Sequence, residues 1–326
     1  HEVALEAYNI ASSIDNPRYT STILNRLGEF ELDRGNIDSS LWYFNNAIGL
    51  DEKSNHTYGK ARTLTNLMAA HRLKGSFYEA EEAGLQAIDL FKSIDRTSSL
   101  IRSHQRLANL YMEWNKPKKS IQQLEIKLNF KQLSKLELGR TYASLGLLNY
   151  SIENYNFARD YYHQARNLFD SLDRKAEIAG ILTNIGNIYI KRNEMDGALD
   201  LNKESIRIYN TLGDMKKTAI NYHNMGLIAE RKGNYSEAIR FYNKSLDLKD
   251  TSSYVANKSL SQFNLANIYK KSGLNDSAIY FYRNVLEFRD TPLSAKMQSN
   301  WNLSTIFMEK GLLASAQFYQ KLYGIL

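Results

Sequence analysis

The chain has 326 residues, of which 43% are hydrophobic and 24% charged, so it can form an apolar core and does not have the composition of a disordered chain. It contains 0 cysteines, which excludes disulfides, zinc sites with thiolate ligands and cysteine nucleophiles. Its 42 Lys and Arg residues against 35 Asp and Glu give a net charge of +7, which permits acidic partners but falls short of the basic stripe typical of nucleic-acid binders.

Turn-forming residues are scarce in the sequence. Only 3 prolines and 17 glycines punctuate it, too few for an all-β sandwich or barrel of this length, so we expect long helices. The sequence has no run of about 18 apolar residues, so we expect no membrane span in this chain. It also shows no pattern typical of a signal peptide.

A large residue followed by a residue that is usually small recurs about every forty positions. The pairs are Leu27-Gly28, Leu67-Met68, Leu107-Ala108, Leu145-Gly146, Ile185-Gly186, Met225-Gly226, Leu265-Ala266 and Leu303-Ser304. Their second members, called anchors below, are separated by 40, 40, 38, 40, 40, 40 and 38 residues. Eight units are therefore in register.

Two further features keep a fixed distance from each anchor. Twelve positions after it stands a small residue: Ser40, Ala80, Ser120, Ala158, Ala198, Ala238, Ala278 or Ala316. Seven positions after it stands Gly35, Gly75, Gly233, Gly273 or Gly311, replaced in the other three units by Asn115, Glu153 and Asn193. The regular spacing predicts that every unit has the same local structure.

Each unit has the pattern of a helical hairpin, and the segment from Asn221 to Leu248 is an example. Apolar residues recur at helical spacing up to Arg231, Lys232-Gly233-Asn234 interrupts the pattern, and Tyr235 opens a second helix. A glycine in the turn can adopt the left-handed conformation that ends a helix. The two small residues allow the helices to cross closely, because a larger side chain would push the backbones apart.

These residues resemble the tetratricopeptide repeat, whose signature is a large and small pair, an aromatic residue three positions later, a glycine turn and alanines on the second helix. Asn224-Met225-Gly226, the segment 231–238 and the segment 241–246 carry the resemblance, which extends over nearly the whole chain. The period is close to 40 instead of about 34, and the final proline is missing. The resemblance to long-period bacterial members implies an all-α fold, a right-handed α-α superhelix (solenoid) of helical hairpins.

In chain order, the solenoid is expected to begin inside a repeat. Ala7 lies 40 residues before Ala47 and Ile10 lies 40 before Leu50, so residues 1–17 fit the second helix of a truncated unit. Residues 18–326 are then expected to form eight repeats in one continuous solenoid. We expect the native protein to continue in both directions, although a swapped or dimeric contact could cover the same ends.

The third unit is the least regular. Its turn reads Asn115-Lys116-Pro117, and Lys127 stands where the family has alanine, so a local irregularity of the superhelix is expected there. At the far end, the segment 322–326 is apolar where a terminal capping helix would turn a polar face to water.

The sequence offers no constellation typical of catalysis. None of the 6 histidines stands at the spacing of a metal-binding helix, and no phosphate-binding glycine loop or nucleophile elbow is present. The recurrent aromatic residues keep a fixed phase and are assigned to the core: Tyr111, Tyr189, Tyr269 and Phe307 on first helices, and Tyr162, Tyr242 and Tyr282 on second helices. We expect no enzymatic activity, no cofactor, and no catalytic or metal-binding residues.

One recurrent feature does not reduce to packing. Two residues before the anchor, five units carry asparagine: Asn66, Asn184, Asn224, Asn264 and Asn302. Asparagine is a mediocre helix former, so its recurrence in mid-helix needs a reason. The amide could bond a neighbouring helix, or it could hold the backbone of an extended peptide, since a carboxamide both donates and accepts.

In tetratricopeptide proteins the first helices line the concave surface, and asparagine at this position commonly holds a peptide backbone. That resemblance predicts a peptide-binding role for this asparagine ladder. One residue earlier in the sequence stand His223, Phe263 and Trp301, which are expected to form an aromatic wall in repeats 6 to 8. Asn109, Asn187 and Asn267, one residue after the anchor, are expected to extend the polar strip.

Repeats 2 to 4 carry a basic stretch instead. Arg62, Arg102 and Arg140 recur early in the first helices, and Arg106 replaces the ladder asparagine in repeat 3. Asn66, Arg102 and Arg106 match positions of the carboxylate clamp of chaperone-binding tetratricopeptide proteins, but Asn25 and Glu29 stand where that clamp has lysine and asparagine. Arg102 and Arg106 could hold a carboxylate, because guanidinium groups bind it bidentately, or they could be ordinary solvated arginines.

The sequence therefore predicts a non-catalytic module that holds an extended protein or peptide segment in its concave groove. The segment would present acidic groups to the arginines; no direct nucleic-acid contact is expected, and a homo-oligomer is compatible with the ends. The alternative is a sensory or oligomerising region of a larger bacterial signalling protein, such as a transcription regulator or histidine kinase. The abundance of Asn, Tyr, Lys and Ile suggests a bacterial source, and either a cytoplasmic or a periplasmic location fits.

Overall fold

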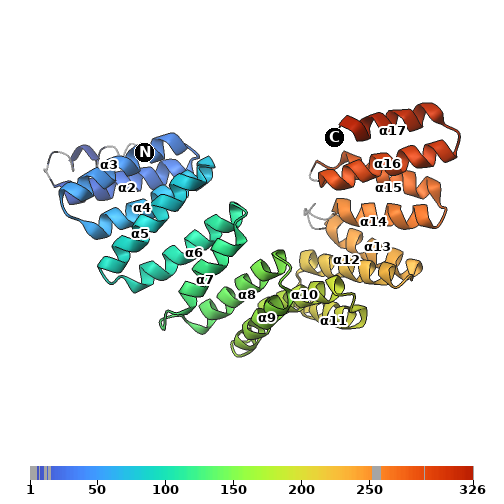
Figure 1. Cartoon of the computed structure of the whole chain (residues 1–326), viewed down its shortest axis with the longest axis horizontal. Coiled ribbons are helices and arrows are strands. Elements are labelled where there is room, and N and C mark those ends of the chain that lie inside the picture. Colours follow the sequence, from blue (N-terminus) through green and yellow to red (C-terminus); the bar gives the residue numbers. More distant parts are fainter. Residues whose placement is uncertain are drawn as a thin grey trace. The chain divides into compact units, whose positions relative to one another are not determined.

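A computed structural model shows the chain as a series of antiparallel helical hairpins (Figure 1). It describes residues 6, 8–10, 13, 16–251, 258–289 and 291–325, and within these ranges the chain forms helices and no strand. The all-α fold of stacked helical hairpins expected from the sequence is thus confirmed. Most of the truncated unit expected at residues 1–17 lies outside the described residues.

The chain divides into two compact units, His1–Tyr161 and Tyr162–Leu326, which we describe separately. The N-terminal unit contains α2 (Pro17–Asp33), α3 (Ile37–Lys53), α4 (Thr57–Lys74), α5 (Phe77–Ser93), α6 (Thr97–Glu113), α7 (Pro117–Leu128) and α8 (Lys135–Ser151). The C-terminal unit contains α10 (Lys175–Lys191), α11 (Met195–Thr211), α12 (Met215–Arg231), α13 (Tyr235–Thr251), α14 (Lys258–Lys271), α15 (Asn275–Glu287), α16 (Leu293–Glu309) and α17 (Leu313–Ile325). Helix α9 (Tyr155–Asp170) spans the division.

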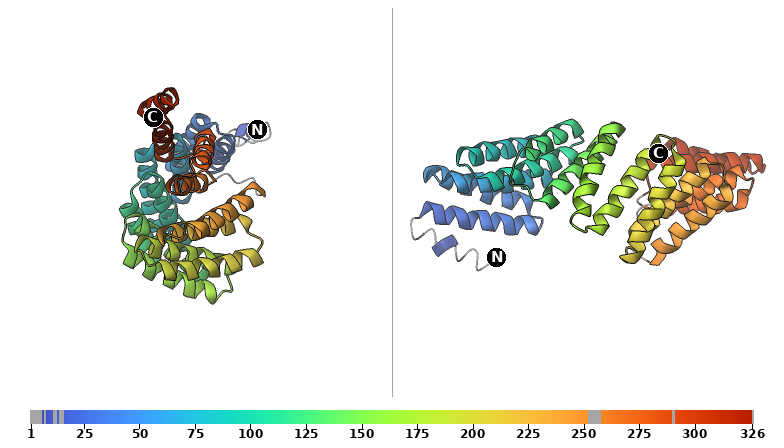
Figure 2. Two further views of the ribbon diagram at one scale, coloured as in Figure 1. Left: turned by 90° about the vertical axis from the view of Figure 1, so that its right-hand side faces the viewer. Right: turned by 90° about the horizontal axis from the view of Figure 1, so that it is seen from below.

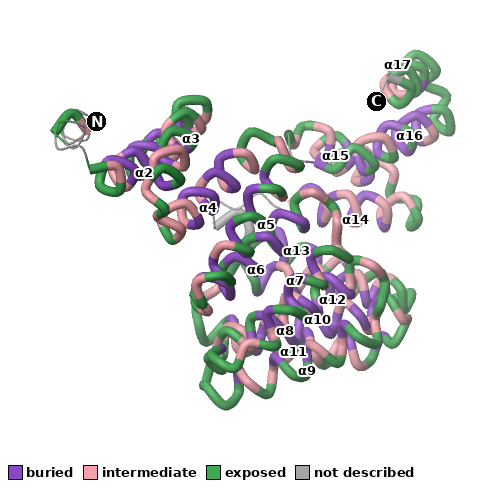
Figure 3. The backbone as a smooth tube through the Cα atoms, turned by 60° about the vertical axis from the view of Figure 1, so that its left-hand side comes forward, coloured by how far each residue is buried: buried purple, intermediate pink, exposed green. Residues whose placement is uncertain are grey.

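Each hairpin is built from an even-numbered first helix and the odd-numbered second helix that follows it. Repeat 1 is the pair α2 and α3, and repeat 8 is the pair α16 and α17. Neighbouring helices of a unit run side by side in Figures 1 and 2, and Figure 3 shows that buried and exposed stretches alternate along most of them. This alternation is what amphipathic helices packed into a stack produce.

The turns inside the hairpins have the backbone that the sequence predicted. Gly35, Gly75, Gly233, Gly273 and Gly311 all have φ between 72° and 81°, and their replacements Asn115, Glu153 and Asn193 also adopt positive φ, from 54° to 64°. In repeat 6, the N–H of Gly233 donates to the carbonyl of Glu230 and that of Asn234 to the carbonyl of Ala229, both at 2.9 Å. These two bonds satisfy carbonyls at the end of α12 and stop the helix.

The anchors Gly28 and Gly226 are small because the second helix leaves no room beside them. A Cβ atom added to Gly28 would lie 2.5 Å from the ring of Phe44, and one added to Gly226 would lie 2.6 Å from the ring of Tyr242. The small residues twelve positions later are buried as well, with at most 2% exposure. Close crossing of the two helices, which the sequence pattern predicted, is therefore confirmed.

Repeat 3 has the shortest second helix of the described repeats, and an irregularity of the superhelix there stays a prediction. Its second helix α7 has only 12 residues, against 16 or 17 in most others, and residues 129–134 connect it to α8. Lys127 is 5% exposed, and its ammonium donates to the side-chain oxygen of Gln105 at 2.7 Å. Burial lowers the pKa of Lys127, while the carboxylate of Glu137 opposes that shift.

First helices of several successive hairpins contact one another. In the C-terminal unit α10 contacts α12, α12 contacts α14 and α14 contacts α16, and in the N-terminal unit α2 contacts α4. In the described part of the chain, no two second helices of successive hairpins make comparable contact. We call the surface that each unit builds from its first helices the first-helix face.

Candidate functional site

Six of the ten predicted binding residues line hollows on the first-helix faces. Asn66, Arg102 and Arg106 lie in one hollow of the N-terminal unit, called the arginine hollow. Asn184 lies in a second hollow, the amide hollow, and Phe263 and Asn302 lie in a third, the lysine hollow; both belong to the C-terminal unit. Asn224, Asn264, His223 and Trp301 line none of these three.

The arginine hollow gathers three cationic side chains from two first helices. Arg62 comes from α4, and Arg102 and Arg106 from α6, around a volume of about 220 Å³. Arg102 reaches only the hydroxyl of Ser99, at 3.4 Å, and none of the three guanidinium groups forms an ion pair with a carboxylate of the described residues. Tyr58 and Phe91 supply an aromatic wall.

The hollow carries an excess of positive charge. Desolvation and, next, the nearby charge of Arg102 lower the pKa of Arg106, and the carboxylate of Glu29 only partly opposes them. Glu29 is engaged elsewhere: it accepts hydrogen bonds from Asn66 at 2.7 Å and from Arg26 at 2.8 Å. An anion placed between the arginines would therefore meet donors that the protein itself leaves free.

The positions that depart from a carboxylate clamp have a structural use. Asn25 and Glu29, on α2, accept the two amide hydrogens of Asn66 at 3.0 and 2.7 Å. The Asn66 amide therefore points its nitrogen at its own chain. Its oxygen accepts no hydrogen bond from a described residue, so this acceptor and the three arginines are the groups that the hollow can offer to a ligand.

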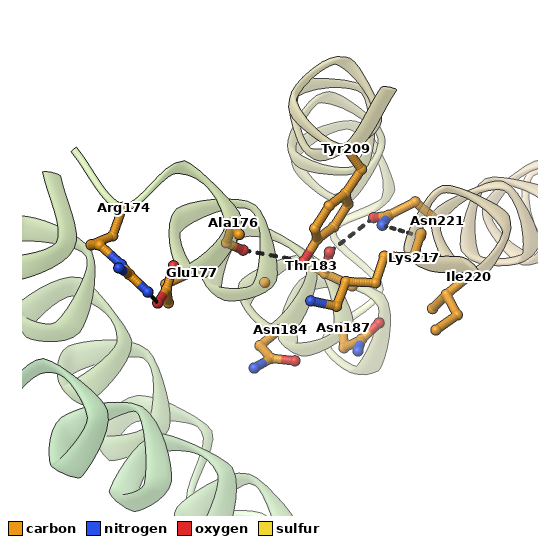
Figure 4. A pocket seen from close by; sticks show the side chains of 11 residues that line it. Arg174, Ala176, Glu177, Thr183, Asn184, Asn187, Tyr209, Lys217, Ile220 and Asn221 are labelled. Atoms are coloured by element: carbon orange, nitrogen blue, oxygen red, sulfur yellow. Dashed lines mark hydrogen bonds and ion pairs between the residues drawn. The ribbon is translucent and has the colours of Figure 1, made fainter. Parts of the chain in front are cut away.

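The amide hollow has a volume of about 590 Å³ and lies on α10, α11 and α12. Figure 4 shows the amide of Asn184 apart from the other side chains, and it forms no hydrogen bond with any described residue. Asn187, one turn further on, accepts from Asn224 at 2.9 Å through its oxygen, which leaves its amide hydrogens free within the described structure. Two carboxamides thus present unused donors on this wall.

The opposite walls of the amide hollow are held by internal contacts. Tyr209 donates to the carbonyl of Ala176 at 3.4 Å, and burial raises its pKa far above the ordinary value, with Asp214 and Glu177 adding to the shift. The ammonium of Lys217 lies 5.2 Å from the Tyr209 ring. Thr183 donates to the oxygen of Asn221 at 3.0 Å. These contacts fix the shape of the hollow around the two free amides.

The lysine hollow, of about 580 Å³, is closed by a hydrogen-bond network. Lys270 donates to Asn302 and to Thr305, both at 2.9 Å, and Asn302 donates to the Tyr282 hydroxyl at 2.9 Å. Tyr282 in turn donates to the oxygen of Asn267 at 2.6 Å. Burial lowers the pKa of Lys270, while Glu309 opposes that shift.

The asparagine ladder makes a periodic set of contacts to the preceding repeat. Asn224 donates to Asn187 at 2.9 Å and Asn202 at 3.2 Å, and Asn264 donates to the Tyr242 hydroxyl at 3.2 Å. With Asn66 and Asn302, four of the five side chains bond neighbouring helices, as the structural interpretation of the ladder anticipates. Asn184 alone keeps its whole amide free of described partners. A ligand-binding role for the ladder stays a prediction.

The three residues of the expected aromatic wall of repeats 6 to 8 each pack against a different partner, and a common wall stays a prediction. The imidazole of His223 lies 2.8 Å from the hydroxyl of Ser261, and its ring packs against Tyr242. Phe263 meets Tyr282 edge to face at 6.2 Å between centroids. Trp301, 44% exposed, packs against Tyr323 of α17 at 5.4 Å. Of the three, only Phe263 lines the lysine hollow.

Several residues that shape the hollows carried no signal in the sequence. Lys270, Lys217 and Tyr58 stand at positions that hold other residue types in the remaining repeats, so periodicity does not single them out. Among the described residues, no group of three or more His, Asp or Glu side chains could hold a metal ion. In the same part of the chain, no helix combines the length and apolarity needed to span a bilayer.

Comparison with known proteins identifies the repeat. Residues 177–251 and 217–291 match the tetratricopeptide repeat family. The fold is similar to the apo form of RapI, with 12% identity, a TM-score of 0.61, and coverage of 82% of this chain and 96% of that one. It is also similar to the apo form of the quorum sensor NprR from B. thuringiensis, with 16% identity, a TM-score of 0.61 and coverage of 83% and 77%.

A third similar structure is aspartyl phosphate phosphatase F from Bacillus subtilis, at 18% identity and a TM-score of 0.59, with coverage of 86% of this chain and 74% of that one. No curated protein matches the chain by sequence. At these identities the similarity shows the fold alone. The family match identifies tetratricopeptide repeats at residues 177–291, and the similar structures share the fold of stacked helical hairpins.

Proposed function

We propose that the chain is a non-catalytic module that binds an extended segment of a protein partner on its first-helix faces. The observation that carries the proposal is the set of unused polar groups in the hollows. No described carboxylate forms an ion pair with Arg62, Arg102 or Arg106. The amide of Asn184 has no hydrogen-bond partner among the described residues. Groups that a fold leaves unpaired in a concave surface are available to a ligand.

The arginine hollow favours an acidic group on the partner. A carboxylate between Arg102 and Arg106 would offset the mutual repulsion of the two guanidinium groups and could bond both. The volume of about 220 Å³ suits one side chain better than a folded surface. The partner is therefore a flexible segment with Asp, Glu or a terminal carboxylate.

Single hydrogen bonds would not suffice for binding. Each contributes on the order of 1 kcal/mol net, whereas micromolar affinity needs about 8 kcal/mol. An extended segment that uses several hollows of one unit would add these contributions. The wider amide hollow, of about 590 Å³, could take a larger side chain beside a backbone held by Asn184.

Proteins of similar fold support the proposal. A Rap protein was determined in complex with Competence and Sporulation Factor, with 16% identity, a TM-score of 0.50 and coverage of 88% of this chain. The similarity to the quorum sensor NprR also fits the alternative, a sensory region of a larger signalling protein. Both functions would use the first-helix faces.

The proposal is tested by selecting linear peptides from a displayed random library against the purified chain. We expect recovered peptides to be enriched in Asp and Glu, because the three arginines of the hollow form no ion pair with a described carboxylate. Arg106→Ala should remove this enrichment and weaken binding of the best acidic peptide about tenfold, the equivalent of one charge-assisted hydrogen bond.

The matched control is Arg140→Ala. Arg140 is an exposed arginine of the same unit, on α8, and does not line the arginine hollow. Arg140→Ala removes the same charge as Arg106→Ala, so a general electrostatic effect would weaken peptide binding equally in both variants. Equal effects, or a recovered pool without acidic residues, would contradict the proposed role of the arginine hollow.

A further inference from the structure

A fourth hollow lies in repeat 6 and shares no residue with the three described above. Its volume is about 260 Å³, and it lies between α11, α12 and α13. It is lined by Leu199, Met225, Ile228, Ala229, Lys232, Asn234, Glu237 and Phe241. We call it the repeat-6 slot. Its inner walls are apolar, and its polar residues Lys232 and Asn234 are exposed.

The slot lies where other repeats place an aromatic ring. Ala229 stands three residues after its anchor, the position of Tyr111, Tyr189, Tyr269 and Phe307 in repeats 3, 5, 7 and 8. In repeat 7 that ring stacks on the ring twelve residues later, with Tyr269 and Phe281 5.5 Å apart and 8° from parallel. In repeat 8, Phe307 stacks on Tyr319 at 5.6 Å and 6°.

Repeat 6 keeps one half of this pair and lacks the other. Phe241 is the equivalent of Phe281 and Tyr319, but alanine replaces the ring that would pack against it. Phe241 contacts Tyr222 of α12 at 6.3 Å, and it still lines the empty slot beside Ala229. The slot is therefore the space that an aromatic side chain fills in neighbouring repeats.

The same eight positions in repeat 3 show what fills this space. They are Glu81, Leu107, Leu110, Tyr111, Trp114, Lys116, Lys119 and Gln123, each 118 residues before its counterpart in the slot. There the rings of Tyr111 and Trp114 lie 6.4 Å apart and nearly parallel, and the Tyr111 hydroxyl donates to Glu81. Repeat 6 has Ala229 and Lys232 at these two ring positions.

We propose that the repeat-6 slot is a binding site for a single aromatic ring of the phenyl or phenol type. An apolar cavity of roughly 150 Å³ is large enough to bind benzene, and the slot, which has apolar inner walls and a polar rim, is larger. Met225 and Ile228, at most 4% exposed, offer a polarisable and an aliphatic wall, and Phe241 offers a ring. Glu237 at the rim can accept the hydroxyl of a phenol.

The ring can come from two sources: a free aromatic molecule, or a tyrosine or phenylalanine side chain of a bound segment. The chemistry of the slot is the same for both. This inference does not depend on the proposed function, because the slot lies apart from the arginine, amide and lysine hollows. It adds a site of different ligand chemistry to the molecule.

The test uses the chain with ¹³C-labelled methionine methyl groups, titrated with p-cresol and separately with N-acetyl-tyrosinamide. Binding in the slot should shift the Met225 methyl resonance in a saturable way. A shift with p-cresol alone assigns the slot to free aromatic molecules, and a shift with both probes shows that it admits a side chain on a peptide backbone. No saturable Met225 shift with either probe overturns the proposal.

Two variants distinguish this site from non-specific contact. Ala229→Phe should abolish the Met225 response and raise the Tm, because the added ring fills the space as Phe307 does in repeat 8. Phe241→Leu should weaken p-cresol binding several-fold while the chain stays folded, and it decides the matter if Ala229→Phe does not fold. Unchanged binding in either folded variant contradicts the assignment.

A reciprocal variant provides the matched control. Tyr269→Ala removes the equivalent ring in repeat 7 and should create a second slot, which is read from p-cresol contacts to Phe281 after ring labelling. Binding should then reach two molecules of p-cresol per chain instead of one. If Tyr269→Ala stays folded and binds no additional p-cresol, the argument from equivalent positions fails.

Discussion

At the scale of single residues, one sequence position serves two different purposes. Asn224 is 9% exposed, and its amide connects Asn187 of α10 with Asn202 of α11. Asn184, at the equivalent position of the repeat before, bonds no described residue and faces the amide hollow. An asparagine at this repeat position therefore joins helices in repeat 6 and has no described hydrogen-bond partner in repeat 5.

This difference predicts opposite effects of the same substitution. Asn224→Ala should lower the free energy of unfolding by about 1–3 kcal/mol, because the oxygen of the fully buried Asn202 loses its donor. Asn184→Ala should change it by less than about 0.5 kcal/mol, as surface substitutions usually do. Urea unfolding of both variants followed by circular dichroism measures the two values. Equal losses of stability would show that Asn184 also has a structural partner.

At the scale of elements, the hairpin depends on two kinds of glycine. The turn glycines have positive φ and open space around them, so their role is conformational. Gly28 and Gly226 lie inside helices, and their role is to leave room for an aromatic ring of the second helix. Gly49 of α3 has neither role, since nothing lies within 4 Å of an added Cβ atom and its φ is not positive.

Alanine substitution distinguishes a helical glycine that makes room for a ring from one that does not, within the N-terminal unit. Gly28→Ala should cost about 1–3 kcal/mol of stability, because the new methyl group would overlap the Phe44 ring. Gly49→Ala should add about 0.5–1 kcal/mol, because alanine restricts the unfolded chain and favours the helix. Thermal unfolding of the two variants measures both shifts. A stabilising Gly28→Ala would mean that Phe44 moves aside freely and that the helices need not cross closely.

Much of this architecture could be predicted from the sequence, for physical reasons. The anchors, the small residues twelve positions later and the turn glycines are fixed by steric and backbone limits, and those limits act in every repeat. The helix ends predicted for the segment from Asn221 to Leu248 also agree with the structure, because α12 ends at Arg231 and α13 begins at Tyr235. The left-handed residues between hairpins, Asn55, Asp95, Asp173 and Gly213, were not predicted, because no single residue type recurs at that position.

The site was less predictable than the fold. The sequence indicated which residues lie on the first helices. It did not indicate which of their amides would form hydrogen bonds with neighbouring side chains. Asn264 bonds a tyrosine hydroxyl of α13, while Asn184 bonds nothing among the described residues. Such differences depend on single non-periodic neighbours. Lys270 is another case, since its ammonium closes the lysine hollow and no repeat position foretells it.

At the scale of the whole molecule, the chain combines a uniform scaffold with hollows of different chemistry. The N-terminal unit offers arginines, and the C-terminal unit offers amides, a lysine network and the repeat-6 slot. Repeated packing fixes the positions of the first helices, and the non-repeated side chains on them set the ligand chemistry. This division lets one fold bind different partners after few substitutions.

Site-specific photo-crosslinking can show whether the partner segment lies on the first-helix faces. In two variants, benzoylphenylalanine replaces Tyr58, which lines the arginine hollow, or Ile220, which lines the amide hollow. In two control variants it replaces Tyr78 or Tyr280, which are exposed on second helices. With the best peptide from the library selection, we expect crosslinks from Tyr58 or Ile220 and none from the other two positions. Crosslinks formed only from Tyr78 or Tyr280 would contradict the account.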